Sequence, residues 1–335
     1  MAENHTMQIS VVIPIYNEEE ILSELHRRLH EVFSKMKYRS EFIFVDDGSR
    51  DSSLPILVSL HKKDARVKIL SLSRNFGHQT AISAGIAHAS GDALIVMDGD
   101  LQDPPEILPQ FIAKWREGYD VVYAIRKKRK ENVFKRIAYM LFYRILKAVS
   151  YLNIPLDSGD FCIMDKRVAD VLRQLPERNR FVRGLRTWAG FRQTGLEYGR
   201  ERRYAGKPKY SLSKLMKLAY DGIFSFSEVP LRIAIYTGVI AAVLSFAGGA
   251  LVIYQKVSNS VPIAGWASTM VTLVFLGGLI LMTLGIVGEY VGRIHEEIKQ
   301  RPLYVVQDKI GFANGPRSRK SRRPGTKRHD GSVHS

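Results

Sequence analysis

The residues with the clearest chemical potential form an acidic segment that follows an apolar run at positions 93–97. Asp98 and Asp100 flank Gly99. Gln102 adds a neutral side-chain oxygen shortly afterwards. Hard oxygen ligands at alternate positions suit Mg²⁺ or Mn²⁺, which retain several waters and take substrate phosphates as further ligands. A solvated acidic turn is the alternative for an isolated Asp-x-Asp pair, so the metal prediction depends on the rest of the chain.

A second pair of carboxylates, Asp46 and Asp47, follows an apolar run at 41–45. These side chains can accept the ring N–H of uracil or guanine, or a ribose hydroxyl. Capping of the next helix is the alternative use for the pair. The sequence contains neither GxGxxG nor GxxxxGK[ST], which disfavours a Rossmann dinucleotide site and a P-loop. Phosphates would then be held by a metal and by basic side chains.

The elements that must position these carboxylates alternate along the first part of the chain. Apolar runs typical of strands occur at 7–15, 41–45, 67–72, 93–97 and 119–125. Helical patterns separate them at 21–33, from 51, at 76–89 and from 104. This alternation predicts a mostly parallel, doubly wound α/β sheet, and ligands bind such sheets at the carboxyl ends of the strands.

The composition indicates anionic partners and a membrane. The 335 residues carry a net charge of +17, which favours nucleic acid, phosphorylated substrates or an acidic membrane surface. Cys162 is the single cysteine, so no internal disulfide framework is expected. Two apolar stretches, 231–254 and 266–288, each have the roughly 20 residues needed to cross a bilayer. A buried soluble hairpin is the alternative for them.

The charges that flank these stretches predict the topology. Arg232 lies on one side, Arg293, Lys299 and Arg301 lie on the other, and the intervening loop carries only Lys256. The positive-inside rule therefore places the α/β domain and both termini in the cytoplasm, with the protein integral to the plasma membrane. The expected units are an α/β domain at 1–210, an interfacial helix and linker at 211–230, transmembrane helices at 231–254 and 266–288, a cytoplasmic segment at 289–313 and a disordered basic tail at 314–335.

Basic residues cluster at two further places. Arg126 begins a run of five cations directly after the strand pattern at 119–125, and it is the cation best placed to meet a donor or acceptor phosphate. An amphipathic pattern at 134–149 fits a membrane interface or an ordinary core-facing helix. A later loop is dense in phosphate-seeking groups: Arg200, Arg202, Arg203, Lys207 and Lys209. Nucleic-acid binding is the alternative for such a patch, but no recognisable nucleic-acid module accompanies it.

Three short segments of the chain, taken together, resemble the inverting glycosyltransferase family 2. They are residues 11–18, 45–49 and 98–102, and the resemblance extends over roughly residues 8 to 305. Within the family the chain is most similar to polyprenyl-phosphate glycosyltransferases, the group that contains dolichyl-phosphate mannose synthase and the bacterial GtrB-like glucosyltransferases. The resemblance implies a GT-A-type sheet followed by interfacial amphipathic helices and a two-helix transmembrane region.

The resemblance also assigns roles to individual positions. The residues that match the family's metal-carrying positions are Asp98, Asp100 and Gln102. Those that match its nucleoside-binding positions are Pro14, Tyr16, Glu18, Asp46 and Asp47. With Gly99 and Arg126 these residues form the expected nucleotide-sugar site. The basic loop that begins at Arg200 would close over the donor and acceptor phosphates.

A third acidic segment is the candidate for the catalytic carboxylate. Asp157 is the first choice, for orienting the acceptor or taking a proton, and Asp160 is its rival. Ser158 is a candidate donor to a phosphate. A lipid phosphate with a second pKa of about 6 is largely deprotonated at neutral pH, so a strong general base is not chemically required.

These features predict metal-dependent, inverting transfer of glucose from UDP-glucose to a polyprenyl phosphate such as undecaprenyl phosphate. Alternatives are GDP-mannose or another sugar nucleotide as donor, a polysaccharide- or glycolipid-elongating synthase, and a non-catalytic nucleotide-sensing membrane anchor. The elongating synthases carry Gln-x-x-Arg-Trp, where this chain has Arg183 in place of the Gln and an inserted Thr187. Membrane lipids are expected partners, nucleic acid is not, and GtrB-like relatives suggest a homo-oligomer, specifically a tetramer.

Overall fold

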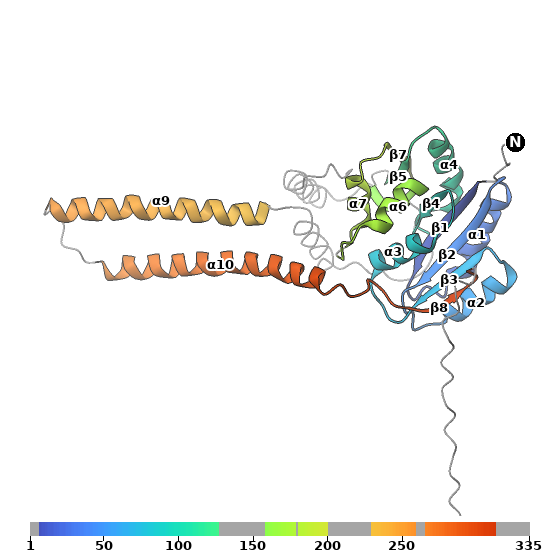
Figure 1. Ribbon diagram of the computed structural model, residues 1–335, viewed down its shortest axis with the longest axis horizontal. Coiled ribbons are helices and arrows are strands. Elements are labelled where there is room, and N and C mark those ends of the chain that lie inside the picture. The colour runs from blue at the N-terminus through green and yellow to red at the C-terminus, as the bar shows by residue number, and fades with distance from the viewer. Residues whose placement is uncertain (1–6, 127–157, 179, 200–228, 259–264, 313–335) are drawn as a thin grey trace, which may run out of the picture.

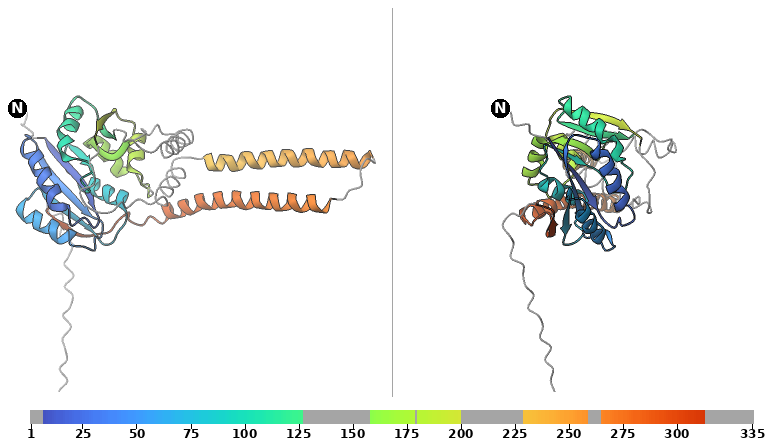
Figure 2. Two further views of the ribbon diagram at one scale, coloured as in Figure 1. Left: turned by 180° about the vertical axis from the view of Figure 1, so that it is seen from behind. Right: turned by 90° about the vertical axis from the view of Figure 1, so that its right-hand side faces the viewer.

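The computed structural model describes residues 7–126, 158–178, 180–199, 229–258 and 265–312. An α/β domain stands at one end, and two long helices project from it side by side (Figures 1 and 2). The predicted amphipathic patterns at 134–149 and 211–226 and the predicted tail at 314–335 lie outside the described residues.

Eight strands form a single sheet in the order β7-β5-β6-β4-β1-β2-β3-β8. The strands are β1 (Gln8–Ile15), β2 (Arg39–Asp46), β3 (Val67–Leu72), β4 (Ala93–Val96), β5 (Val121–Arg126), β6 (Ser158–Asp165), β7 (Gln193–Tyr198) and β8 (Val306–Ile310). Strands β4, β1, β2 and β3 are parallel neighbours, as are β5 and β7. Strand β6 pairs antiparallel with both β4 and β5, and β8 pairs antiparallel with β3. The prediction of a mostly parallel α/β sheet is confirmed.

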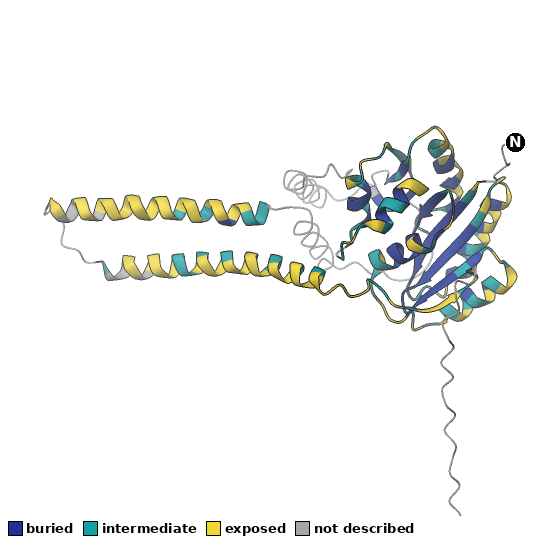
Figure 3. Ribbon diagram, viewed as in Figure 1, coloured by how far each residue is buried: buried dark blue, intermediate teal, exposed yellow. Residues whose placement is uncertain are grey.

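Helices cover both faces of the sheet (Figure 2). One core contains residues of α1 (Leu22–Ser34), α2 (Ser53–Lys63), the short η1 (Pro105–Ile107) and α4 (Leu108–Arg116). The other contains residues of α3 (His78–His88), α6 (Lys166–Gln174) and α7 (Val182–Trp188). Because β1 is buried on both faces, its second half, residues 11–15, is continuously apolar rather than alternating. Buried strands appear dark blue in Figure 3.

The two projecting helices are α9 (Val229–Val257) and α10 (Trp266–Ile298). Both contain a stretch long and apolar enough to cross a membrane, at Val229–Leu251 and Val271–Ile298. Their large apolar side chains are mostly exposed (Figure 3). They therefore have the character of a membrane hairpin rather than of buried core helices.

The chain returns from the hairpin to the sheet of the α/β domain. After α10 it pairs as β8 antiparallel to β3, and the Val305 carbonyl accepts a hydrogen bond from the Ser73 amide at 2.9 Å. The amide of Arg178 donates to Glu297 Oε1, at the end of α10, at 2.9 Å. The sequence did not predict β8 or β7. The hairpin is thus attached to the sheet by hydrogen bonds as well as by the covalent chain.

Candidate functional site

The carboxyl ends of β1 and β2 meet at one edge of the sheet. Pro14 is in register with Val45, and the Asp47 amide donates to the Ile15 carbonyl at 2.8 Å. Beyond β1, the amide of Glu18 donates to Ser53 Oγ at 3.0 Å. The loops that follow the two strands are therefore joined. Tyr16 and Glu18, both predicted to contact the nucleoside, are half-buried at this edge.

The two carboxylates that end β2 are buried and hydrogen-bonded within the chain. Asp46 accepts from the Ser49 amide at 3.1 Å and from Ser71 Oγ at 3.3 Å. Asp47 accepts from two successive amides directly before α3, those of Phe76 at 2.7 Å and Gly77 at 2.9 Å. Burial raises the pKa of Asp47 although these amides lower it. Asp47 thus anchors the segment directly before α3, which is not the next helix along the chain.

The segment that follows β4 has a tightly constrained backbone. A Cβ on Gly99 would lie 2.6 Å from the Ile15 Cδ1 atom, so any larger residue there would require the Ile15 side chain to move. Asp100 Oδ1 accepts the Gln102 amide at 3.1 Å, and Leu101 adopts a left-handed backbone with φ of 56°. Asp98 and Gln102 are half-buried and Asp100 is buried. This turn brings the predicted metal ligands to the same edge as Asp46.

A histidine that sequence reasoning missed joins two parts of the site. His78 Nε2 lies 3.4 Å from Asp98 Oδ1 and 3.6 Å from Asp160 Oδ2. Burial alone would lower the pKa of His78, but the nearby carboxylates of Asp160 and Asp98 raise it to about 9. His78 therefore carries a positive charge between two carboxylates. The only signal in the sequence was its place at the start of a helix that follows a predicted strand.

Asp160 reaches this site from β6. Gln79 Nε2 donates to its Oδ2 atom at 2.7 Å, while Oδ1 is buried without a hydrogen-bond partner in the part of the chain that the structure describes. Burial raises its pKa, but His78 and the charge of Arg183 hold the pKa well below its usual range. Asp160 is thus an ionised carboxylate with one oxygen unsatisfied. Such an atom is the kind that a ligand or ion satisfies.

The predicted divalent ion fits this set of donors. Burial raises the pKa of Asp98 to about 6, and three neighbouring carboxylates add to the rise against the opposing charge of His78. The three neighbours are Asp103, Asp100 and Asp160. Four neighbouring carboxylates place more negative charge here than His78 alone neutralises. A hard divalent cation would relieve that repulsion and bind the oxygen ligands it prefers.

Of the remaining predicted residues, two are located by the backbone register of their strands and the others lie outside the described residues. Arg126 ends β5 with its backbone in register with Tyr198, and Ser158 begins β6 in register with Ile125. Asp157 lies outside the described residues, as do Arg200, Arg202, Arg203, Lys207 and Lys209. Of the two rival catalytic carboxylates, Asp160 is the one seen beside Asp98.

Two protein-family models match this chain, one over the α/β domain and one over the helical hairpin. The model for glycosyl transferase family 2 matches residues 10–173, and that for the GtrB C-terminal hairpin matches residues 229–294. The chain is 48% identical over 309 residues to the uncharacterized glycosyltransferase YkcC of Bacillus subtilis, covering 92% of this chain and 96% of the relative. It is 40% identical over 302 residues to the SfII prophage-derived bactoprenol glucosyl transferase of Shigella flexneri, covering 90% and 98%.

Among solved structures, a crystal structure of glucosyl-3-phosphoglycerate synthase from Mycobacterium tuberculosis, in complex with Mn²⁺ and UDP-glucose, is similar over 65% of this chain and 77% of that one. The sequence identity is 18% and the TM-score is 0.43.

Proposed function

The chain belongs to glycosyl transferase family 2 and carries a GtrB C-terminal hairpin, and from this premise we propose that it transfers glucose from UDP-glucose to a polyprenyl phosphate. Relatives named bactoprenol glucosyl transferases, about 40% identical over 90% of the chain, support this choice of substrates. The observation that carries the proposal is the pair of carboxylates, Asp98 and Asp160, beside His78 at the carboxyl edge of the sheet, with Asp100 close enough to raise the pKa of Asp98.

On the donor side, Asp98, Asp100 and Gln102 would hold Mg²⁺ or Mn²⁺. When bound, the ion neutralises the charge that develops on the departing nucleoside diphosphate. Gly99, which lies between the two aspartates, is buried against the Ile15 side chain and would form part of the nucleotide-sugar site through its backbone. The nucleoside would lie against the end of β1 and the end of β2, where Pro14, Tyr16, Glu18, Asp46 and Asp47 gather.

On the acceptor side, an oxygen of the lipid phosphate attacks the anomeric carbon from the face opposite the leaving group. The bond from that carbon to the UDP oxygen breaks, UDP leaves with the electron pair, and the configuration inverts. The products are UDP and a polyprenyl phosphoglucose. Because the attacking phosphate is already largely deprotonated at neutral pH, Asp160 or Asp157 need only orient it.

Cations would hold the phosphates of both substrates in the same place. Arg126 ends β5 at the carboxylate edge, and Ser158 begins the strand that carries Asp160. Arg200, Arg202, Arg203, Lys207 and Lys209 complete the proposed phosphate-binding set. Neutralising these anions at the reacting centre would be the largest single catalytic contribution.

The hairpin would fix this site at the height of the lipid headgroups. The donor is water-soluble and the acceptor phosphate lies at the bilayer surface, so the enzyme must present a soluble site to a membrane. We place α9 and α10 across the membrane with the catalytic domain and both termini in the cytoplasm. The flanking cations Arg232, Arg293, Lys299 and Arg301 support this topology. A homo-oligomer, specifically a tetramer, is part of the proposal.

The test is a transfer assay with the purified full chain. It uses undecaprenyl phosphate, Mg²⁺ and a panel of radiolabelled sugar nucleotides that includes UDP-glucose and GDP-mannose. We expect label in the organic phase with UDP-glucose. Label from another donor alone would overturn the choice of sugar, and no label from any donor would overturn the transferase proposal itself.

A matched pair of variants tests the site. We expect Asp100→Asn to lower transfer by about 100-fold or more, since it removes a charged group at the reacting centre. Glu106→Gln is the control, because Glu106 lies in the same acidic segment but is exposed and paired with Arg28. Its turnover should stay close to that of the wild type. Equal turnover in the two variants would refute the assignment.

A further inference from the structure

Asp103 closes the acidic segment that begins at Asp98, and neither the sequence prediction nor the proposed mechanism gives it a role. It is only 1% exposed. Its Oδ1 atom accepts a hydrogen bond from the hydroxyl of Tyr198, the last residue of β7. This bond joins segments that are far apart in the sequence and lie on different strands of the sheet. It is therefore a tertiary contact at one end of the predicted metal-binding turn.

The Tyr198 ring is held rigidly. It is 4% exposed and meets the Phe161 ring edge-to-face, with centroids 5.8 Å apart. Phe161 in turn stacks on Phe111 of α4 at 4.8 Å. Interlocked aromatic rings of this kind have few alternative positions. The direction of the Tyr198 hydroxyl is thus fixed by the core and not by Asp103.

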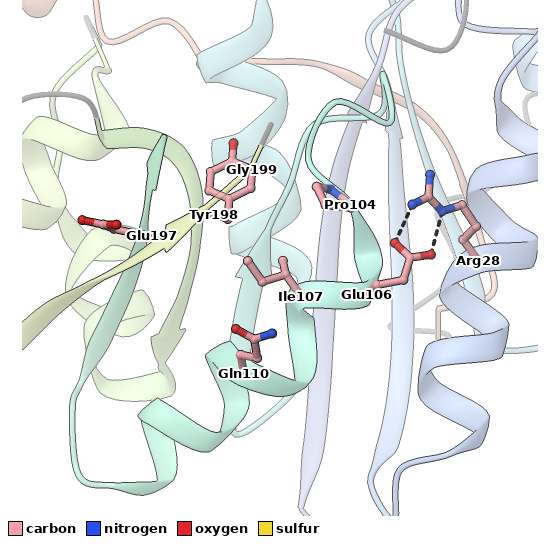
Figure 4. Close-up of a pocket in the computed structure, with 8 residues that line it drawn as sticks. All are labelled: Arg28, Pro104, Glu106, Ile107, Gln110, Glu197, Tyr198 and Gly199. Carbon is pink, nitrogen blue, oxygen red and sulfur yellow. Dashed lines mark hydrogen bonds and ion pairs between the residues drawn. The ribbon is translucent and has the colours of Figure 1, made fainter. Parts of the chain in front are cut away.

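Tyr198 also lies next to open space. It lines a cavity of about 600 Å³ with Pro104 and Ile107 of the segment after Asp103, and with the Arg28–Glu106 ion pair (Figure 4). The segment after Asp103 is also anchored in the core by Ile107 and Leu108. The hydrogen bond to Tyr198 is a restraint on the position of the Asp103 side chain itself.

The turn between Asp98 and Asp103 needs such a restraint. Leu101 is a buried, non-glycine residue in the left-handed region, with φ of 56°. Conformations of this kind persist only where the surrounding structure holds them. Inside the turn, the described structure shows the hydrogen bond from the Gln102 amide to Asp100. At its far end it shows the bond between Asp103 and Tyr198.

We propose that Tyr198 is a positioning residue for the nucleotide and metal site, acting through Asp103 to hold residues 98–102 in the conformation that presents Asp98 and Asp100 together. This inference rests on the proposed function. In that function Tyr198 contacts neither the nucleotide sugar nor the lipid phosphate. The rival account is that Asp103 matters only as a negative charge near the ion, whatever the tyrosine does.

The variants D103N and D103N/Y198F separate these accounts. They differ only in the phenolic hydroxyl, because an amide oxygen at position 103 still accepts that hydrogen bond. The single variant Y198F would leave the Asp103 carboxylate buried without this hydrogen bond, which can prevent folding. Both chosen variants avoid this, because they have no carboxylate at position 103. Y123F is the control, since Tyr123 lies on the adjacent strand β5 and packs against the other core.

The measurement is Mn²⁺ binding in the presence of UDP, followed by electron paramagnetic resonance on the full chain without acceptor lipid. Loss of a group that orients metal ligands typically lowers affinity about 10- to 100-fold, and we expect a loss of that order between D103N and D103N/Y198F. Donor KM should rise in parallel, while the KM for the lipid phosphate and the melting temperature change little. Y123F should bind as the wild type does.

Two results would overturn the inference. One is equal Mn²⁺ affinity in D103N and D103N/Y198F. The other is a full loss already in D103N, which would make the charge of Asp103 the cause. Failure of the wild type to bind Mn²⁺ and UDP at all would instead overturn the proposed function, so the two failures are distinguishable.

Discussion

Replacing Asp47 by alanine tests whether this carboxylate organises the site by holding the start of α3. The substitution removes the acceptor for the Phe76 and Gly77 amides, which bind it at 2.7 and 2.9 Å. Hydrogen bonds to a charged group contribute about 1.5–3 kcal/mol each, so the gross loss is about 3–6 kcal/mol. Burial of the charge, which raises the pKa of Asp47, offsets part of this. We therefore expect a net destabilisation of about 3 kcal/mol.

The expected loss corresponds to a melting temperature lower by about 6–12 °C for a domain of this size. Asp47→Asn keeps one acceptor oxygen and should lose about half as much. The assay is a thermal melt of the purified full chain, combined with hydrogen exchange of a peptide covering residues 73–82. In the alanine variant the amides of Phe76 and Gly77 should exchange faster, since they lose their partner.

The control is Glu31→Ala, which removes an exposed carboxylate paired with Arg27 and Lys35. Such surface changes fall within about 0.5 kcal/mol. If Asp47→Ala melts with the wild type and the peptide at 73–82 keeps its protection, the carboxylate does not anchor α3. The position of His78, at the first residue of that helix, would then need another explanation.

Three further perturbations have expected outcomes. Mn²⁺ affinity should rise as the pH increases through about 6, the pKa of Asp98, because a proton competes with the ion below that value. An affinity that does not change between about pH 5 and 7.5 would exclude Asp98 as a ligand. Gly85→Ala should destabilise the chain by about 1–3 kcal/mol in a thermal melt, since the added Cβ would lie 2.2 Å from Val12 Cγ1; an unchanged melt would refute the overpacking. Ending the chain after Gln300 removes β8 and so uncovers the edge of β3. The melting temperature should fall, and the protein should associate in size-exclusion chromatography. A monodisperse, equally stable product would contradict this prediction.

The sequence was most informative where strands are buried on both faces. Continuous apolar runs in β1, β2 and β4 gave their positions, and the acidic residues at their ends gave one edge of the site. Strands β7 and β8 escaped prediction because β7 is mostly half-buried and contains glycine, and β8 is mostly exposed and contains polar residues. Their strand conformation depends on a neighbouring strand that is distant in the sequence.

The contacts of His78 with Asp98 and Asp160 could not be predicted for a related reason. Asp160 reaches Asp98 because β6 pairs antiparallel with β4 within an otherwise parallel region. No local pattern in the sequence specifies that strand order. The tertiary structure brings Asp160 to the site, whereas Asp157 lies outside the described residues, so the choice between them stays a prediction.

The central claim is that a divalent ion at the carboxyl edge of the sheet carries the nucleotide's diphosphate. Anomalous diffraction from crystals of the full chain grown with Mn²⁺ and UDP tests it most directly. We predict a manganese peak within about 2.5 Å of carboxylate oxygens of both Asp98 and Asp100, in contact with the diphosphate. Bound UDP with no ion beside these two residues would contradict the account.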